Sequence, residues 1–227
     1  MLILKYQKTG DATFISHIDT LRYLTRAMRR TGYDVEYSKG FNPHMMLNLS
    51  APLAMGVASL AEYVTIGIND IAPQEFLAKY NSVTTPNLRG VKCWAVDKNP
   101  NIAALATASV YDYPVSDVLT MSQVVQRINA APVYEITYTQ KGKEVTKDVK
   151  DMIHSLTIGT DKIRMILASG NTNLRADRLL TAICADAHQE FRLSAILRTM
   201  QLTSFSGKFL NVDSYLNSCA TAVSEFK

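Results

Sequence analysis

A strand and a capped helix are predicted near the start of the chain, where residues 2–32 have the sequence LILKYQKTGDATFISHIDTLRYLTRAMRRTG. The apolar residues 2–7 predict a strand, and the glycine and polar residues that follow predict a loop. Ser16 precedes a segment of helical periodicity, and Asp19 stands at the third helical position, which makes a capping box with Asp in place of Glu. Gly32 is typical of a helix end, so we expect a helix over about 16–31.

The order of the elements that follow predicts the fold. We expect, in chain order, a short strand over 33–37, a loop over 38–44, strands over 45–49 and 62–68, a helix from Pro73 to Val83, and a strand over 88–96. Apart from the extra short strand, this is the β-α-β-β-α-β order of the ferredoxin-like motif.

A second ferredoxin-like half is predicted beyond the polar segment 97–101, which contains a proline and marks the expected domain boundary. The same order of elements returns there. We expect a strand over 108–115, a helix that begins with a capping box of Thr120 and Gln123, hairpins over 134–149 and 155–168, a helix over 175–187, a strand over 192–202 and a short helix around 213–223. The sequence thus predicts an α+β protein of two ferredoxin-like (βαββαβ) domains in tandem, 1–100 and 101–227. Each is expected to be an antiparallel sheet with helices on one face, and the second carries a C-terminal extension.

Composition and cysteine spacing exclude several classes of protein. Of the 227 residues, 47% are hydrophobic and 19% are charged, which is a globular balance. No apolar run approaches the roughly 20 residues of a membrane helix, and the start lacks the basic region of a signal peptide. The scattered Cys93, Cys184 and Cys219 argue against disulfides and exclude a local cysteine cluster for iron–sulfur or zinc. We therefore expect a cytoplasmic protein without a cofactor of its own.

The predicted first helix has a basic side. The apolar side, expected to pack on a sheet, consists of His17, Thr20, Leu21, Leu24, Ala27 and Met28. The opposite side holds Arg22, Arg26, Arg29 and Arg30, with Asp19 among them. The planar guanidinium suits phosphate, so this side is a candidate contact for nucleic acid, which the net charge of +4 permits. The alternative is a solvated face whose arginines pair with nearby acids.

A polar cluster is expected at the start of the same helix. Ser16, His17 and Asp19 lie on the first turn, where free N–H groups attract anions, and Lys8 and Gly10 come from the preceding loop. A phosphate or carboxylate could bind among them. The alternative is structural, in which Ser16 and Asp19 only cap the helix and His17 is hydrogen-bonded inside the fold.

The loop over residues 38–44 supplies further candidates, because loops carry binding sites more often than cores do. Its polar candidates for anion or RNA contact are Lys39, Asn42 and His44. Phe41 either stacks on a base or fills the core under its loop. His17 or His44 could act as an acid, a base or a donor, and a zinc or iron site of His17, Asp19 and His44 is a further alternative.

A second anion-binding loop is conceivable at residues 169–173, before the helix predicted over 175–187. That helix carries Arg175 and Arg178. The loop lacks the full glycine-rich phosphate fingerprint, so a polar loop in which an asparagine caps the helix is the alternative.

Several segments spread over residues 2–202 carry a family resemblance. They are Lys8-Thr9-Gly10, the stretches 14–19, 27–32 and 37–44, Ala51-Pro52-Leu53 with Gly56, residues 169–175, and Leu197-Arg198-Thr199. Ser-His-Ile-Asp (16–19) and Gly-Phe-Asn-Pro-His (40–44) are the most specific. These segments resemble the radical-SAM-linked family, a domain of unknown function found beside or fused to radical SAM proteins.

This resemblance implies an accessory role beside a radical SAM protein. That partner would hold the S-adenosylmethionine and the iron–sulfur cluster, since the chain has no CxxxCxxC motif. Met45 and Met46 depart from the family pattern, in which proline and a basic residue follow the histidine. The departure implies a weaker phosphate contact by this loop.

Three functions are compatible with these features. The first is a non-catalytic accessory that holds tRNA or rRNA for a radical SAM partner, with contacts from the arginine side, the 38–44 loop, Lys8, Gly10, Ser16 and Arg175. The second is an RNA-processing or RNA-modifying enzyme that uses His17 or His44, since tandem ferredoxin-like domains are similar in architecture to RNA-processing endonucleases of CRISPR systems. The third is a protein-interaction module that docks a radical SAM enzyme without RNA.

Overall fold

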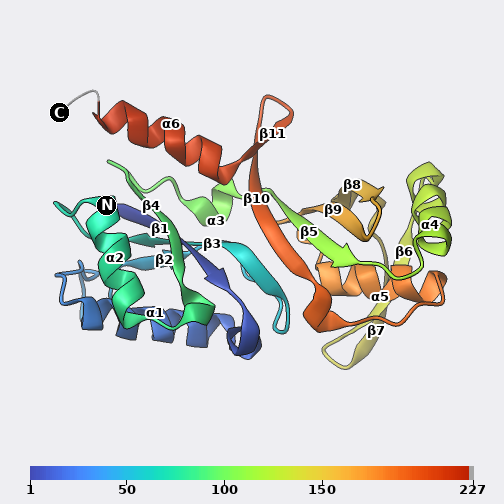
Figure 1. Ribbon diagram of the computed structural model, residues 1–227, viewed down its shortest axis with the longest axis horizontal. Coiled ribbons are helices and arrows are strands. Elements are labelled where there is room, and N and C mark those ends of the chain that lie inside the picture. The colour runs from blue at the N-terminus through green and yellow to red at the C-terminus, as the bar shows by residue number, and fades with distance from the viewer. Residues whose placement is uncertain (225–227) are drawn as a thin grey trace.

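The first strand and the first helix lie where the sequence predicts them. The structure, a computed structural model, describes residues 1–224 (Figure 1). β1 spans Leu2–Lys8 and α1 spans His17–Thr31. The Oγ of Ser16 accepts a hydrogen bond from the backbone N–H of Asp19 at 3.1 Å, which confirms the predicted cap. The next residue after α1 is a glycine with a left-handed φ of 77°, which ends the helix as expected.

The strands of the N-terminal part lie in the order β4-β1-β3-β2, and each neighbouring pair is antiparallel. Its remaining elements are β2 (Leu47–Leu49), β3 (Ala58–Ile66), α2 (Pro73–Val83) and β4 (Gly90–Ala95). α1 and α2 pack on one face of these strands, where Leu24 and Phe76 are fully buried in one cluster with Leu4 and Ile66.

Two strands of this part differ from the prediction. The strand expected over 33–37 does not form. Within that stretch Tyr37 makes an isolated bridge to Met45, and the backbone of Glu36 donates to the carbonyl of Gly67 and accepts from the N–H of Met46. β3 begins at Ala58 rather than at residue 62, because Ala58 and its neighbour Ser59 pair with a strand near residue 197. A partner so distant in the chain leaves no local pattern in the sequence.

The C-terminal part has the strand order β10-β5-β9-β8, again with antiparallel neighbours. Its elements are α3 (Ile102–Leu105), β5 (Ala108–Pro114), α4 (Val118–Ala130), β6 (Glu135–Gln140), β7 (Lys143–Asp148), β8 (Ile153–Ile158), β9 (Lys162–Ala168), α5 (Ala176–Asp186), β10 (Leu197–Phe205), β11 (Lys208–Asn211) and α6 (Val212–Ser224). β6 and β7 form a separate two-stranded hairpin.

The start of α4 corrects a predicted cap. Thr120 was expected to cap the helix with Gln123, but the helix begins three residues earlier and Asp117 is the cap. The carboxylate of Asp117 accepts hydrogen bonds from the backbone N–H of Thr120 at 3.1 Å and from its hydroxyl at 2.6 Å. Asp is as good an N-cap residue as Thr, and Asp117 lies directly before the first helical residue.

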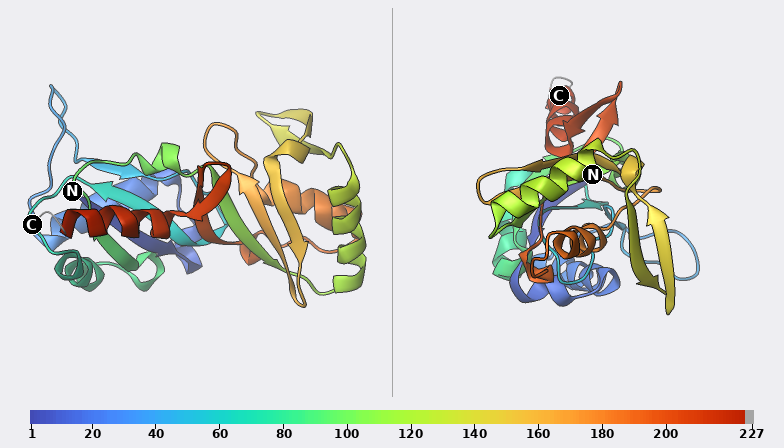
Figure 2. Two further views of the ribbon diagram at one scale, coloured as in Figure 1. Left: turned by 90° about the horizontal axis from the view of Figure 1, so that it is seen from above. Right: turned by 90° about the vertical axis from the view of Figure 1, so that its right-hand side faces the viewer.

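One continuous sheet joins the two parts. β10 runs parallel to β3, with Leu197 opposite Ala58 and Arg198 opposite Ser59, so the main path reads β4-β1-β3-β10-β5-β9-β8. With β2 and β11 attached to its side, the sheet has nine strands within the described residues. The protein is therefore a mixed α+β fold with a mostly antiparallel sheet and helices packed against it (Figures 1 and 2).

The C-terminal helix returns to the N-terminal part. Successive residues of a strand point to opposite faces, so Ile3 and Tyr63 lie on the face that α1 and α2 leave uncovered. Val212 and Leu216 of α6 are fully buried there in one cluster with Ile3 and Tyr63. Helices thus cover both faces of this part, where the sequence predicted one (Figure 1).

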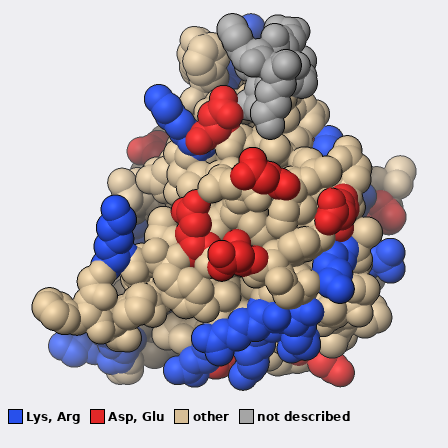
Figure 3. Space-filling model, turned by 90° about the vertical axis from the view of Figure 1, so that its left-hand side faces the viewer, with Lys and Arg blue, Asp and Glu red and all other residues tan. Residues whose placement is uncertain are grey.

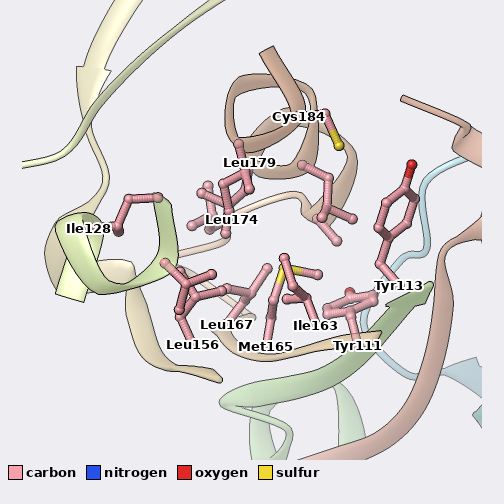
Figure 4. Packing of buried hydrophobic residues seen from close by; sticks show 14 of the residues in the cluster. Tyr111, Tyr113, Ile128, Leu156, Ile163, Met165, Leu167, Leu174, Leu179 and Cys184 are labelled. Atoms are coloured by element: carbon pink, nitrogen blue, oxygen red, sulfur yellow. The ribbon is translucent and has the colours of Figure 1, made fainter. Parts of the chain in front are cut away.

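A larger apolar core holds the C-terminal part together (Figure 4). Ile128 of α4 and Leu179 of α5 face Leu156 and Met165 on the sheet, and all of them are at most 3% exposed. Among the residues that the structure describes, no helix is both long and apolar enough to cross a bilayer.

Candidate nucleic-acid interface

The arginine side of α1 is exposed along its whole length. Arg22 forms an ion pair with Asp19 at 2.9 Å, and Arg30 donates to the carbonyl of Val83 at 3.0 and 3.2 Å. Arg26 and Arg29 have no hydrogen-bond or ion-pair partner in the described part of the chain. Lys and Arg gather along the lower edge of the face in Figure 3, the edge at which α1 lies in Figure 1. Two arginines of the predicted basic side, Arg22 and Arg30, therefore have partners within the protein, and Arg26 and Arg29 are free to bind a ligand.

Ser16 and Asp19 are engaged with each other and with the helix. The hydroxyl of Ser16 donates to a carboxylate oxygen of Asp19 at 2.7 Å while its oxygen caps the helix. The hydrogen bond from Ser16 and the neighbouring Arg22 lower the pKa of Asp19 below its ordinary value. These contacts match the structural alternative for both residues.

Lys8 and Gly10 shape the turn before α1 rather than line an exposed anion site. Lys8 is 3% exposed, and its ammonium donates to the carbonyl of Ile15 at 2.8 Å. Burial lowers the pKa of Lys8, and the Arg198 guanidinium lowers it further against the opposing charge of Glu62. Gly10 has a φ of 50°, and a Cβ there would lie 2.8 Å from the side chain of Asn87.

The loop over residues 38–44 closes on itself and projects from the body of the protein (Figure 2). The backbone N–H of Ser38 donates to the carbonyl of His44 at 2.8 Å, and the Ser38 hydroxyl is hydrogen-bonded to Nδ1 of His44 at 2.8 Å. Lys39, Asn42 and His44 are exposed. Phe41 is fully exposed at the tip, so the alternative in which it fills the core is wrong.

His17 lies at a cavity and not in the core, which corrects its expected place. The cavity has a volume of about 440 Å³ and is lined by His17 and Leu21 of α1, by β2, and by residues of the segment 99–103. Because β2 is only three residues long, it leaves space beside the first turn of α1. Partial burial lowers the pKa of the His17 imidazole, so the ring is neutral at neutral pH.

The structure does not bring His17, Asp19 and His44 together as metal ligands. His44 is not among the residues of the His17 cavity. Over residues 1–224, no group of three or more His, Cys, Asp or Glu side chains has an arrangement that could hold a metal ion.

A buried cluster of charges, which sequence reasoning missed, lies where the two parts of the sheet join. Arg198 of β10 forms an ion pair with Glu62 of β3, and both are almost fully buried. The guanidinium also donates to the carbonyl of Ala51 at 3.4 Å. Lys8 pairs with Ser59 across β1 and β3, and Ser59 pairs with Arg198, so the two cations lie in one row of the sheet. The signal in the sequence is the presence of a charged residue, Glu62 or Arg198, inside a predicted strand.

The second predicted anion loop carries no free cation. Arg175 binds the carboxylate of Asp177 with two hydrogen bonds of 3.0 and 2.6 Å, and Arg178 lies over the ring of Tyr138 at 3.8 Å. Arg175 is itself the residue that precedes α5, and no side chain caps that helix, so the predicted asparagine cap is wrong. This loop belongs to the C-terminal part and is not a part of the basic side of α1.

Comparison with known proteins places these features in a family. The chain matches the family described as "Uncharacterized protein conserved in bacteria (DUF2344)" over residues 1–176, which include α1, the projecting loop and the cavity. That description names no radical SAM protein, so the expected link stays a proposal. No curated protein matches the chain. Because the match covers well over half of its length, the chain belongs to the DUF2344 family.

Proposed function

We propose that this protein is a non-catalytic RNA-binding accessory that uses the arginine side of α1 and the loop over residues 38–44. The observation that carries the proposal is the complete exposure of Phe41 at the tip of that loop. An aromatic ring in water gains nothing for folding, whereas a nucleobase stacked on it contributes about 1–3 kcal/mol to binding. Lys39 and His44 lie within three residues of the ring and are exposed as well.

The free guanidinium groups of α1 supply the second half of the interface. Arg26 and Arg29 can contact phosphates without any rearrangement of the fold. Arg22 has to break only its exposed ion pair with Asp19, and such a pair contributes little to stability. Phosphate contacts of this kind give affinity without sequence preference and weaken steeply with salt. The loop and α1 belong to the same half of the molecule, so one RNA strand can reach both.

The strand orders support the tandem ferredoxin-like interpretation of the fold. β4-β1-β3-β2 and β10-β5-β9-β8 are both the strand order of a βαββαβ segment with antiparallel neighbours, and in the second segment the separate β6–β7 hairpin is inserted between α4 and β8. Ferredoxin-like domains often bind RNA, although the fold does not decide the function.

The proposal includes a radical SAM partner and a tRNA or rRNA substrate in the cytoplasm. The support is the sequence resemblance, and in this proposal the S-adenosylmethionine and the iron–sulfur cluster belong to the partner. An anaerobic pull-down tests it. A radical SAM protein retained after ribonuclease treatment would favour direct docking, and its loss after that treatment would mean that RNA bridges the two.

Reversing two charges on α1 should weaken RNA binding. We expect Arg22→Glu with Arg26→Glu to raise the Kd for a tRNA or rRNA fragment about 10- to 100-fold in ~0.1 M salt, and to reduce the slope of log K against log salt concentration by roughly 1–2. A fluorescence anisotropy titration at two salt concentrations measures both.

The matched control is Lys143→Glu with Lys147→Glu on β7, where both lysines are exposed. Each reversal lowers the charge by two, so either pair takes the net charge from +4 to 0. An equal loss of affinity in the two pairs would show that only total charge matters, and would remove α1 as the contact surface.

Truncating the exposed ring should weaken binding by another mechanism. We expect Phe41→Ala to raise the Kd about tenfold without changing the salt slope, because stacking releases no counterions. Phe41→Trp should preserve the affinity, and neither change should shift the melting temperature, since the ring touches no core residue. An unchanged Kd for Phe41→Ala would contradict stacking by this loop.

An RNA-processing enzyme is the second candidate, and one observation favours it. The lowered pKa of His17 keeps the imidazole in the neutral form that a general base needs. End-labelled RNA in the same titrations would show cleavage products if this candidate is right.

A further inference from the structure

We propose that the cavity beside His17 binds one unstacked nucleobase. The inference rests on the proposed RNA binding and adds a ligand class and a second contact to it. The cavity lies between the first turn of α1, the short edge strand β2 and the segment that leads into α3.

The lining of the cavity suits a neutral, flat, polar ligand. Its residues are His17, Leu21, Leu47, Asn48, Leu49, Asn99, Asn101, Ile102 and Ala103, and none of them is Lys, Arg, Asp or Glu. A phosphate or carboxylate would find no cation here. Apolar walls with a few amide groups are the surroundings in which proteins hold splayed-out bases, whose edges both donate and accept hydrogen bonds.

The amide groups of the cavity are available. Asn48 and Asn101 are exposed, and their side chains have no hydrogen-bond partner among the described residues. Asn99 accepts from the backbone N–H of Asn101 at 2.8 Å through its carbonyl oxygen, which leaves its NH₂ group unused. The neutral ring of His17 can donate with one nitrogen and accept with the other. The volume of about 440 Å³ lies within the range of small-molecule sites, roughly 300–1,000 Å³.

The cavity lies beside both parts of the proposed interface. His17 and Leu21 are on the side of α1 opposite Arg22 and Arg26, near the first turn of the same helix, and the Phe41 loop leads through Met45 and Met46 into β2. In this proposal an RNA strand crosses the first turn of α1, with its phosphates on the arginine side, one base in the cavity and another on the ring of Phe41. In this arrangement the arginines supply affinity and the asparagines supply a preference for one base.

The test uses four homopolymeric RNA octamers, one for each of the four bases, and the two variants Asn48→Ala and Asn101→Gly. Asn101 has a φ of 51°, and glycine keeps this conformation, so the second variant removes the side chain without straining the backbone. We expect the unmodified protein to prefer one base over another by about tenfold, and each variant to lose most of that preference with an unchanged salt slope. Asn173→Ala, on the exposed loop of the C-terminal part, is the matched control and should keep the preference.

Free nucleosides distinguish this inference from RNA binding by α1, because they carry no phosphate. In NMR titrations with a nucleoside, a shift of the Leu21 backbone amide signal that is lost in Asn48→Ala would support the cavity even if no RNA bound. RNA binding without base preference and without nucleoside shifts would overturn the cavity and leave the RNA proposal standing. A base preference that survives in both asparagine variants would also overturn it.

Discussion

Glu62→Gln should lower the free energy of unfolding by about 3–5 kcal/mol, because it leaves the guanidinium of Arg198 buried without its carboxylate. Arg198 is 1% exposed and the Glu62 side chain 8%, so water cannot replace the lost partner. Lys8, also buried, adds a second positive charge to the same row of the sheet. Urea denaturation followed by circular dichroism measures the loss as a lower midpoint at unchanged slope.

Two further variants separate the ion pair from a general sensitivity of the fold. Arg127 pairs with Asp186 at 2.9 Å on the surface, so Arg127→Gln should cost about 1 kcal/mol or less. Glu62→Leu combined with Arg198→Met removes both charges and should cost less than the sum of the single changes. If Glu62→Gln were no more destabilising than Arg127→Gln, the buried pair would contribute nothing specific to the join between β3 and β10.

Leu216→Ala on α6 should cost about 2–5 kcal/mol, since it leaves a cavity where a fully buried side chain packs. The position of the effect matters more than its size. Leu216 shares its cluster with Ile3 and Trp94, so hydrogen exchange should accelerate first on β1 and β4. This result would show that the N-terminal strands need a helix from the far end of the chain.

Met121→Ala is the control for Leu216→Ala. Met121 is equally buried, but it packs from α4 onto the C-terminal core. Its loss should accelerate exchange on β8 and β9 and leave β1 and β4 protected. Identical exchange patterns for the two variants would mean that the single sheet opens as one unit, which would contradict a domain boundary at 97–101.

The two halves of the proposed interface differ in how they are held. The arginines of α1 lie on a rigid helix whose apolar side is locked into the core by Leu24 and Met28. Phe41 lies on a loop closed by hydrogen bonds between Ser38 and His44. We therefore expect the helix to set the register of the RNA strand and the loop to adapt to it.

Local features of this protein were determined by the sequence alone. The cap at Ser16 and the end of α1 after Thr31 depend on side chains and backbone angles within a few residues, so they were predictable. The exposure of the arginines followed from helical periodicity in the same way. The order of strands and helices was largely recoverable for the same reason.

Contacts between distant segments were decided only by the tertiary structure. Glu62 and Arg198 meet across 136 residues, and β3 begins early because β10 arrives beside it. The position of His17 depends on how far β2 extends over α1, and the covering of Ile3 depends on where α6 returns. Such contacts form because apolar surface from separate segments is buried together, and the segments themselves carry no mark of their partners. The sequence therefore determined the helix and the loop that carry the candidate residues. Only the packing of these segments decided which of the residues can face a common ligand.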